Sequence, residues 1–405
     1  MKLHYYTISL VAATMIAASP LSVEKIVVNS TIQSDNDQFF TDNNKTAKTN
    51  TQSFVQKSLS TLSTQANMNP YTVIQFSPSV NFTPVDQTGS NEPSYHDPIR
   101  IRGKSQSGPG GVYMINGMPI SSNPGGGKQM IDMEDVSSID LHKGYLGVEK
   151  NLGFSSLIGK IDMNILAAKQ KGGATLSQSF GSDSFKRTFL RFDTGKIGDV
   201  SVFGSISSLS NEKSKGDGDL HRVNGMVGIS YKPNESFKAD VYMLRNADKH
   251  HNYASLNYTE AKDLGTYFNK DFATAHPTAS NDVNYYDWNR QNFDTTAFLG
   301  DFEYKPTSDN TIVLKPYYKK DVGDYWFSKV NASDATKNRV MNWHMDHDLF
   351  GGLASYEHTF DEALKAKIGY WYHKQLPPGP PTDQKKYKVV NGALVFDGGP
   401  GGSCL

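Results

Sequence analysis

The sequence contains a single cysteine, Cys404, and has neither an excess of one charge nor a long apolar segment beyond its first twenty residues. One cysteine excludes a disulfide framework and a cysteine-based zinc site. The 41 basic and 41 acidic residues cancel, which argues against a protein that holds nucleic acid by bulk charge. A mean hydropathy of -0.52 and the lack of apolar runs of spanning length exclude transmembrane helices. A transmembrane β-barrel remains possible, because its strands alternate apolar and polar residues.

Residues 1–19 predict a secretory signal peptide. Lys2 and His4 form a short polar start, the mostly apolar segment Ile8–Ala18 follows, and small residues close it. No cysteine stands directly after this segment, so a lipoprotein anchor is excluded. We therefore expect the chain to be exported.

The remainder divides into three segments by composition. Residues 20–69 begin with a β-prone island and continue as a stretch rich in Asn, Thr, Gln and Ser, which predicts a flexible tether with a weak helix near residues 54–62. Residues 70–172 alternate short apolar runs with Gly- and Pro-rich loops, which predicts a small α/β domain. Residues 173–405 are dominated by segments with an apolar residue at every second position, and these predict β-strands.

The predicted strands have the length and the connections of a membrane barrel. Each is about ten residues long, as a tilted strand needs to be to cross a bilayer. The nine strands are predicted at residues 174–181, 185–194, 199–210, 221–231, 236–246, 293–305, 310–321, 350–360 and 364–374. From the second strand on, short links alternate with long ones, and the long ones are residues 211–220, 247–292 and 322–349. This alternation is typical of outer-membrane barrels, and a soluble β-sandwich gives no reason for it.

Four short motifs follow one another in the N-terminal half. They are Glu24-Lys25-Ile26-Val27-Val28, the pair Ile99–Gly103 and Val112–Pro119, then Met133–Gly144, and Leu157–Ile165. In this order, and ahead of barrel strands, they resemble the TonB box and the plug motifs of siderophore-type TonB-dependent outer-membrane receptors. Three positions depart from the usual pattern, namely Asn116, Tyr145 and Lys160.

The resemblance implies a fold and a set of partners. The expected fold is mainly β: an N-terminal α/β plug domain over residues 70–172, followed by an antiparallel transmembrane β-barrel that contains here only about nine of an expected 22 strands. The tail from Lys374 to Leu405 shows no strand pattern, so we expect a C-terminally truncated receptor, with the missing strands either supplied by a second chain or lost from the gene. The implied location is the outer membrane of a Gram-negative bacterium. The implied partners are the TonB protein with its inner-membrane energising complex, outer-membrane lipid and a small ligand, but no nucleic acid and no cofactor.

The candidate binding residues lie in the N-terminal segment and in two plug loops. Glu24, Lys25, Ile26, Val27 and Val28 are suited to adding a strand to the sheet of TonB, where backbone hydrogen bonds supply the grip. Ligand contacts are expected from Tyr95, His96, Asn123, Lys128 and Gln129, with Lys128 placed to pair with an anionic chelate and Tyr95 to stack on an aromatic group. We expect Arg100 and Arg102 to make charge-assisted hydrogen bonds between plug and barrel. His344 and His347 are weak candidates for a metal or haem site in an outer loop, and no metal site is firm.

These features predict energy-coupled import of a scarce ligand, most plausibly a ferric siderophore, by plug displacement driven from the inner membrane. A haem, cobalamin or nickel receptor of the same build is an alternative. A non-transporting adhesin on a barrel is another, although it would need no TonB box. We expect no enzyme, because no Ser/His/Asp set or carboxylate pair stands in a catalytic context.

Overall fold

The computed structural model describes residues 40–41, 51–86, 88–90, 99–105, 113–121, 129–144, 146, 150, 152, 159–361, 364–379 and 381–399. The chain divides into two compact units, Met1–Gln38 and Phe39–Leu405, and all described residues belong to the second. Among the described residues, no helix has the length and apolar character needed to cross a lipid bilayer.

The N-terminal part of the second unit is a small α/β domain, the plug. Its main sheet has the order β1 (Phe40–Thr41), β2 (Thr51–Val55), β7 (Val136–Lys143), β8 (Gly159–Ile165) and β6 (Tyr113–Ile115), of which only β6 and β8 pair in parallel. A second sheet contains β3 (Val80–Phe82), β4 (Ile99–Ile101) and β5 (Lys104–Ser105). The helices are α2 (Gln56–Leu62), α3 (Tyr71–Ile74) and the short 3-10 helix η1 (Met133–Asp135).

The structured part of the plug begins earlier than the boundary expected at residue 70. β2 pairs with β7, and α2 follows β2 directly, close to the weak helix predicted from the sequence. The side chains of Phe54 and Leu59 are buried in the plug core. Two large apolar residues in a polar stretch are therefore enough to fix this part of the predicted tether.

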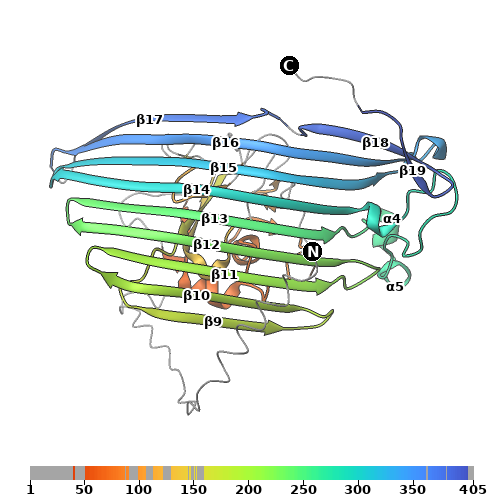
Figure 1. Ribbon diagram of the computed structural model, residues 1–405, viewed down its shortest axis with the longest axis horizontal. Coiled ribbons are helices and arrows are strands. Elements are labelled where there is room, and N and C mark those ends of the chain that lie inside the picture. The colour runs from red at the N-terminus through yellow and green to blue at the C-terminus, as the bar shows by residue number, and fades with distance from the viewer. Residues whose placement is uncertain are drawn as a thin grey trace, which may run out of the picture. The chain divides into compact units, whose positions relative to one another are not determined.

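The rest of the chain forms one large antiparallel sheet, shown in Figure 1. Its strands are β9 (Gly173–Phe180), β10 (Lys186–Ile197), β11 (Val200–Glu212), β12 (Asp219–Asn234), β13 (Phe237–His251), β14 (Arg290–Thr307), β15 (Asn310–Lys329), β16 (Arg339–Thr359), β17 (Lys365–Leu376), β18 (Asp383–Val390) and β19 (Ala393–Phe396). Consecutive strands pair from β9 to β17, as expected for a barrel wall. The predicted fold class, a plug followed by an antiparallel sheet of barrel strands, is confirmed.

The prediction that the tail has no strands is wrong. β18 pairs with β16 at Val340–His344, whereas β17 pairs with β16 at Asp348–Thr359, so β18 continues the line of β17 after a proline-rich break. β19 then pairs with β18 across a turn in which Asn391 and Gly392 have φ of 49° and 81°. Two left-handed residues of the type Asn-Gly form the tight turn that joins hairpin strands. In this tail the alternation of apolar and polar residues is short and interrupted by prolines, so it does not stand out in the sequence.

The predicted loop 322–349 is also mostly strand. β15 runs to Lys329 and β16 starts at Arg339, so the connection is only residues 330–338. The extended strand ends carry their own apolar cluster, in which Trp288, Val340 and Val389 are buried and Trp326 stacks on Tyr387. The ends of β15 and β16 pack against the loop between β13 and β14. This packing therefore stabilises the two strands at lengths greater than a bilayer requires.

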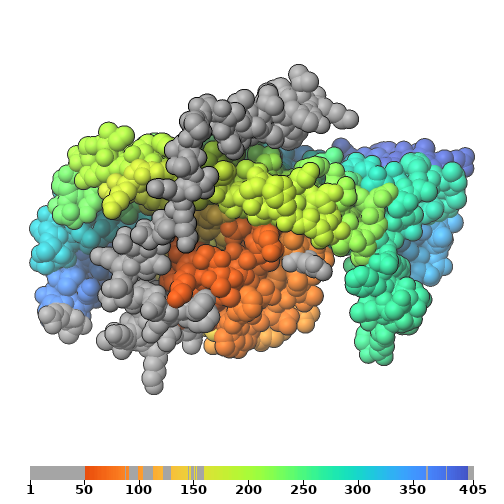
Figure 2. Space-filling view, turned by 90° about the horizontal axis from the view of Figure 1, so that it is seen from below, coloured from red at the N-terminus to blue at the C-terminus, as the bar shows by residue number. Residues whose placement is uncertain are grey.

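The large sheet has two different faces. The inner face contacts the plug, which lies against the sheet in Figure 2. Inward side chains such as Phe203, Tyr242 and Leu299 belong to the same apolar cluster as the plug core. Strand ends joined by residues 213–218, 252–289 and 330–338 form the long-loop end, where α4 (Tyr258–Ala261) and α5 (Leu264–Tyr267) lie, and the opposite end is the short-turn end.

Candidate functional site

The contact between plug and sheet centres on the segment around η1, which carries three carboxylates. Arg187 of β10 donates from Nη1 and Nη2 to the two oxygens of Glu134, at 2.6 and 3.0 Å. The same guanidinium lies 3.3 Å from Oδ1 of Asp132. Bidentate pairing of this kind fixes both distance and orientation, so Arg187 sets how the η1 segment lies against the sheet.

A second arginine of β10, Arg191, binds plug and sheet together. Its Nη1 lies 2.8 Å from Oδ1 of Asp135, and its Nη2 lies 2.9 Å from Oδ1 of Asp193 on its own strand. It also donates to the backbone carbonyls of Leu166 and Ala167 at 3.1 and 3.0 Å. This arginine therefore joins η1 to the segment that leaves the plug for the first barrel strand.

The third arginine, Arg222 of β12, binds the segment that precedes η1. Nη1 lies 2.6 Å from Oδ1 of Asp132, and Nη2 donates to the carbonyl oxygen of Gln129 at 2.8 Å. Next to it, Asn224 donates to the carbonyl of Met130 at 2.7 Å. The end of the predicted ligand loop is thus held against the sheet by its backbone.

The protonation of the plug carboxylates follows from this environment. Burial alone would raise the pKa of Asp132, but the guanidinium groups of Arg222 and Arg187 outweigh it and lower that pKa below its usual value. Burial raises the pKa of Asp135 to about 6, against the opposing effects of Ser205 and Arg191. Asp132 is therefore ionised throughout the physiological range, while Asp135 titrates close to it.

The sign of this interface is the reverse of the one expected. The cations come from the sheet and the described carboxylates from the plug, whereas the sequence suggested Arg100 and Arg102 as the cations. Arg100 is exposed in the small second sheet of the plug, paired with Asn81. The arginines at 187, 191 and 222 occupy inward positions of strands. Polar residues are common at such positions in barrel strands, so the sequence does not mark these three as contacts to the plug.

One departure from the plug motif is explained by the structure. Asn116 and Gly117 form a turn with φ of 48° and 76°. Oδ1 of Asn116 accepts a hydrogen bond from the Ile165 amide at 2.8 Å, and its carbonyl oxygen accepts one from Lys315 of β15, also at 2.8 Å. An amide oxygen serves as acceptor here as well as a carboxylate would.

The structure describes only part of the predicted binding residues. Glu24, Lys25, Ile26, Val27, Val28, Tyr95, His96, Asn123 and Lys128 lie outside the described residues. Gln129 is described and is 6% exposed, so it belongs to the plug–sheet contact, and its role toward a ligand stays a prediction.

The two candidate metal ligands do not share a site. His344 and His347 lie on β16 rather than in a loop, and a separation of three residues places them on opposite faces of the strand. His344 contacts Asp324 at 3.1 Å, whereas His347 is buried. Within the described part of the chain, no group of three or more His, Cys, Asp or Glu residues is arranged to hold a metal ion.

Sequence reasoning did not find a cavity at the long-loop end, which we call the apical cavity. It has a volume of about 290 Å³ and lies between plug residues, including Asp86 and Thr88, and the ends of β9, β10 and β11. Asp183, Glu212 and Tyr253 line it from the sheet side. These residues come from separate hairpins and a distant loop, so no local motif marks them.

Comparison with known proteins identifies the plug. Residues 46–150 match the family described as TonB-dependent Receptor Plug Domain. The chain carries a plug domain of the TonB-dependent receptors. No curated protein sequence matches the chain.

Solved structures show the same fold. The ferric-catecholate import receptor Fiu from Escherichia coli K12, in its open form, is 12% identical with a TM-score of 0.60, over 86% of this chain and 54% of that one. The ferric preacinetobactin receptor BauA from Acinetobacter baumannii is 14% identical with a TM-score of 0.61, over 88% and 51%. The ferric yersiniabactin uptake receptor FyuA from Yersinia pestis is 12% identical with a TM-score of 0.56, over 87% and 60%. The chain thus spans little more than half the length of these receptors.

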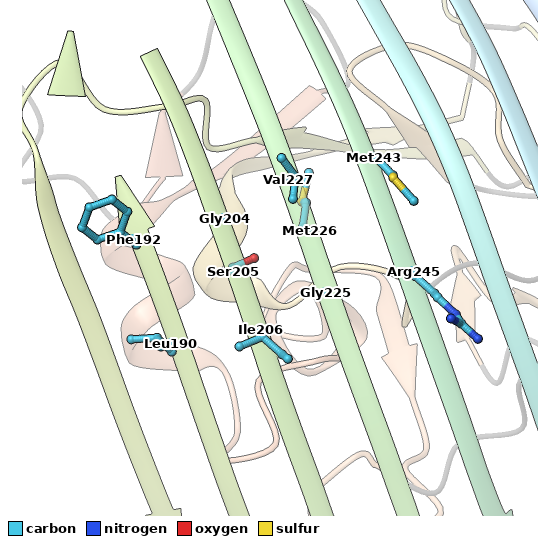
Figure 3. Close-up of a pocket in the computed structure, with 10 residues that line it drawn as sticks. All are labelled: Leu190, Phe192, Gly204, Ser205, Ile206, Gly225, Met226, Val227, Met243 and Arg245. Carbon is cyan, nitrogen blue, oxygen red and sulfur yellow. The ribbon is translucent and has the colours of Figure 1, made fainter. Parts of the chain in front are cut away.

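The outer face of the large sheet differs sharply from its inner face. A shallow apolar groove of about 360 Å³ lies on β10 to β13, at Gly204 and Gly225, which have no side chains. Figure 3 labels the residues that line it. Leu190, Phe192, Ile206, Val227 and Met243 line it and are all more than a third exposed. Apolar side chains in such numbers on a solvent-accessible face indicate a surface that meets lipid or another protein.

Proposed function

We propose that this protein imports a scarce small ligand of the ferric-siderophore class across the outer membrane of a Gram-negative bacterium. The observation that carries the proposal is a folded plug held against the barrel wall by buried but charged contacts, among them the pairs Arg222–Asp132 and Arg187–Glu134, both at 2.6 Å. The three solved receptors described above are receptors of ferric catecholates, preacinetobactin and yersiniabactin. This chain shares their fold but little of their sequence. The shared fold supports the ligand class and leaves the individual ligand open.

The outer face supports a position in the membrane. A band of exposed apolar side chains crosses the strands, with Val241 and Met243 on β13, Phe298 on β14 and Leu314 on β15. Tyrosines mark its short-turn edge, at positions 231, 304 and 356. An apolar band edged by aromatic residues is the lipid-facing pattern of outer-membrane barrels.

Toward the long-loop end the apolar band stops at charged pairs. Arg245 pairs with Asp294 on the next strand at 2.6 Å, and both are well exposed. Lys320 contacts Asp346 and Asp348 at 2.7 and 3.3 Å one strand further on. Charged side chains are favoured in water or among lipid head groups, which supports an outer limit of the membrane at this level.

The plug contact suits displacement by a pull from the inner membrane. As the plug moves, groups that form ion pairs and hydrogen bonds can bond to water instead. Apolar side chains in a contact of the same area cannot form such bonds when they are exposed. The pull would reach the plug through residues 24–28, acting as a strand added to the sheet of TonB.

Removal of residues 24–28 from the chromosomal gene tests the proposal. We expect growth on the ligand to be lost while ligand binding at the cell surface is retained. Growth should be compared on a panel of single iron sources (ferric catecholates, ferric citrate, hydroxamate siderophores and haem), with cobalamin and nickel uptake measured alongside. Unchanged uptake of every compound in the deletion strain would refute energy-coupled import, and uptake of haem, cobalamin or nickel alone would replace the ligand class.

A further inference from the structure

Two histidines and two carboxylates form a chain at the long-loop end, where β12 starts and β13 ends. Nε2 of His221 lies 2.9 Å from Oδ2 of Asp219, and Oδ1 of the same carboxylate lies 3.1 Å from Nδ1 of His251. Nε2 of His251 lies 3.3 Å from Oδ1 of Asp287, which belongs to the 3-10 helix η2 (Tyr286–Trp288) in the connection 252–289. We call these four side chains the histidine clasp, because they join the strand ends to that connection.

The fold fixes the ring of His251 in the middle of the clasp. This side chain is only 9% exposed. One side of it packs against Gly218, where φ is 120° and where a Cβ would lie 2.7 Å from Cγ of the histidine. The ring of Tyr286 lies beside it, with 5.2 Å between the ring centroids. Only glycine suits position 218, both for its backbone conformation and for the close approach of the ring.

The hydrogen bonds of His251 differ between its neutral and protonated forms. The backbone amide of Asp219 donates to Nδ1 at 3.1 Å, which requires an Nδ1 without a hydrogen. The single hydrogen of the neutral ring is then on Nε2 and is donated to Asp287. A protonated ring carries hydrogens on both nitrogens, so it donates to the carboxylates of Asp219 and Asp287 together. Protonation therefore adds a charge-assisted bond between β13 and β12 and places a cation between two carboxylates.

The carboxylate of Asp219 is the centre of charge in the clasp. Among the described residues, its ion-pair partners are the two histidines. Their hydrogen bonds, first that of His221 and then that of His251, hold the pKa of Asp219 well below its usual value, against the effect of burial. The same hydrogen bond to Asp219 raises the pKa of His221, against burial and the nearby charge of Lys249 on β13. Asp219 is therefore ionised wherever the histidines titrate.

The other charged groups around the clasp come from its neighbouring elements. Asp287 also pairs with Arg290 at the start of β14, at 3.2 Å. Lys249 of β13 is directly opposite His221. Asp217 and Tyr286 complete the titratable groups around the clasp in the described part of the chain. All of them lie past the level of Arg245, from which His251 is six residues further along β13, so the clasp lies outside the apolar band.

The direction of the pH response follows from the raised pKa of His221. A histidine whose pKa is raised in the folded state contributes stability that is complete below its unfolded pKa of about 6.5 and is lost as pH rises through the folded pKa. The added bond of protonated His251 acts in the same direction. The clasp is therefore stronger in acid than in mildly alkaline solution.

We propose that the histidine clasp is a pH-dependent hold on the connection 252–289, which protonation of His221 and His251 ties to β12 and β13 and loss of those protons releases. The connection carries α4, α5 and the exposed apolar side chains of Tyr258, Leu264 and Phe268, so the mobility of these groups depends on pH. This inference goes beyond the proposed import, and only the placement of the clasp outside the cell rests on it.

Hydrogen exchange with mass spectrometry on the full chain in detergent micelles tests the proposal. Exchange is measured near pH 5.5 and near pH 8, on either side of the range in which histidine titrates, and is divided by the intrinsic rate at each pH. The reporters are the amides of Asn252 and Tyr286, which donate to carbonyl oxygens within the connection at 2.7 and 3.0 Å. The test variant is His221→Gln with His251→Gln, because glutamine offers a donor and an acceptor as a neutral ring does but takes up no proton. His276→Gln is the matched control, since this histidine lies on the same connection but bonds the carbonyl oxygen of Pro277.

We expect the reporters of the unaltered chain to exchange about fivefold more slowly in acid, the size of effect that a partly exposed ion pair has. The double variant should exchange equally at both pH values, and His276→Gln should keep the full response. Should the double variant not fold, His221→Gln alone, at a position more than half exposed, must still reduce the response.

Three results would overturn the clasp: no response to pH in the unaltered chain, a full response in the double variant, or loss of the response in His276→Gln. Because the clasp needs no pull from the inner membrane, deletion of residues 24–28 must leave the response unchanged. A failure of import is thereby distinguished from a failure of the clasp.

Discussion

Replacement of Arg222 by Met tests whether the charged contacts hold the plug. The guanidinium pairs with Asp132 at 2.6 Å and donates to the carbonyl oxygen of Gln129. Both partners are almost completely buried. Removing one member of a buried pair leaves the other uncompensated and costs about 3–5 kcal/mol. Since Arg187 still lies near Asp132, we expect the lower figure, about 3 kcal/mol, which corresponds to about a hundredfold rise in local opening.

Hydrogen exchange with mass spectrometry measures this opening directly. The amides of Asp135 and Leu166 report on it, because they bond to the carbonyls of Asp132 and Asp135 within the docked segment. Arg245→Met is the matched control, since Arg245 forms an ion pair of the same length with Asp294 but is 65% exposed on the outer face. An exposed pair contributes about 0–1 kcal/mol, so exchange of the plug amides should not change in the control.

A double-mutant cycle with Asp132→Asn sharpens the result. If the two side chains stabilise the contact through each other, the double variant should lose about 1.5–3 kcal/mol less than the sum of the single variants. Additive losses would show that each residue acts through other partners. Exchange in Arg222→Met within threefold of the unaltered receptor would refute the view that the ion pairs anchor the plug.

Three further results are expected. The raised pKa of Asp135, about 6, means that its contribution to the folded state is complete at low pH and lost as pH rises through 6, so plug protection should strengthen by about 1 kcal/mol from pH 7 to pH 5 and stay flat in Asp135→Asn. Gly228→Ala should destabilise the receptor by about 1–3 kcal/mol in thermal unfolding, because a Cβ there meets the rings of Phe203 and Tyr242. Gly204→Ala, with open space around its Cβ position on the outer face, should leave unfolding unchanged.

Much of the large sheet could be predicted because its outer face and its plug-facing side carry different kinds of side chain at alternate positions. On β13, Val241 and Met243 face outward while Tyr242 and Leu244 face the plug, so the period of two is visible in the sequence. The same cause explains the errors. Beyond the apolar band the alternation is interrupted, so the sequence predicts a loop where β15 and β16 extend.

The plug–sheet contact could not be predicted because its residues carry no local signal. Arg187 and Arg222 occupy ordinary inward strand positions, and their partner Asp132 is separated from Arg222 by 90 residues. The apical cavity has the same property, since Asp86, Asp183 and Tyr253 are brought together only by the fold. Local motifs identify the plug and its turns, as at Asn116 and Gly117. Contacts between plug and sheet depend on how the strands are aligned across the whole sheet, which no local motif encodes.

The chemistry of the plug contact has a consequence for the proposed displacement of the plug. Buried ion pairs contribute little to the free energy of folding, because the cost of desolvation offsets most of the attraction. They nevertheless require one particular arrangement of the paired groups. The three arginines therefore specify where the plug sits more than they hold it there. An apolar replacement of both members of one pair, such as Arg222→Met with Asp132→Leu, would keep or raise stability while removing groups that water can solvate once the plug shifts. Such a variant should hold its plug as firmly as before and release it more slowly under a pull, so the charged pair affects release more than it affects stability.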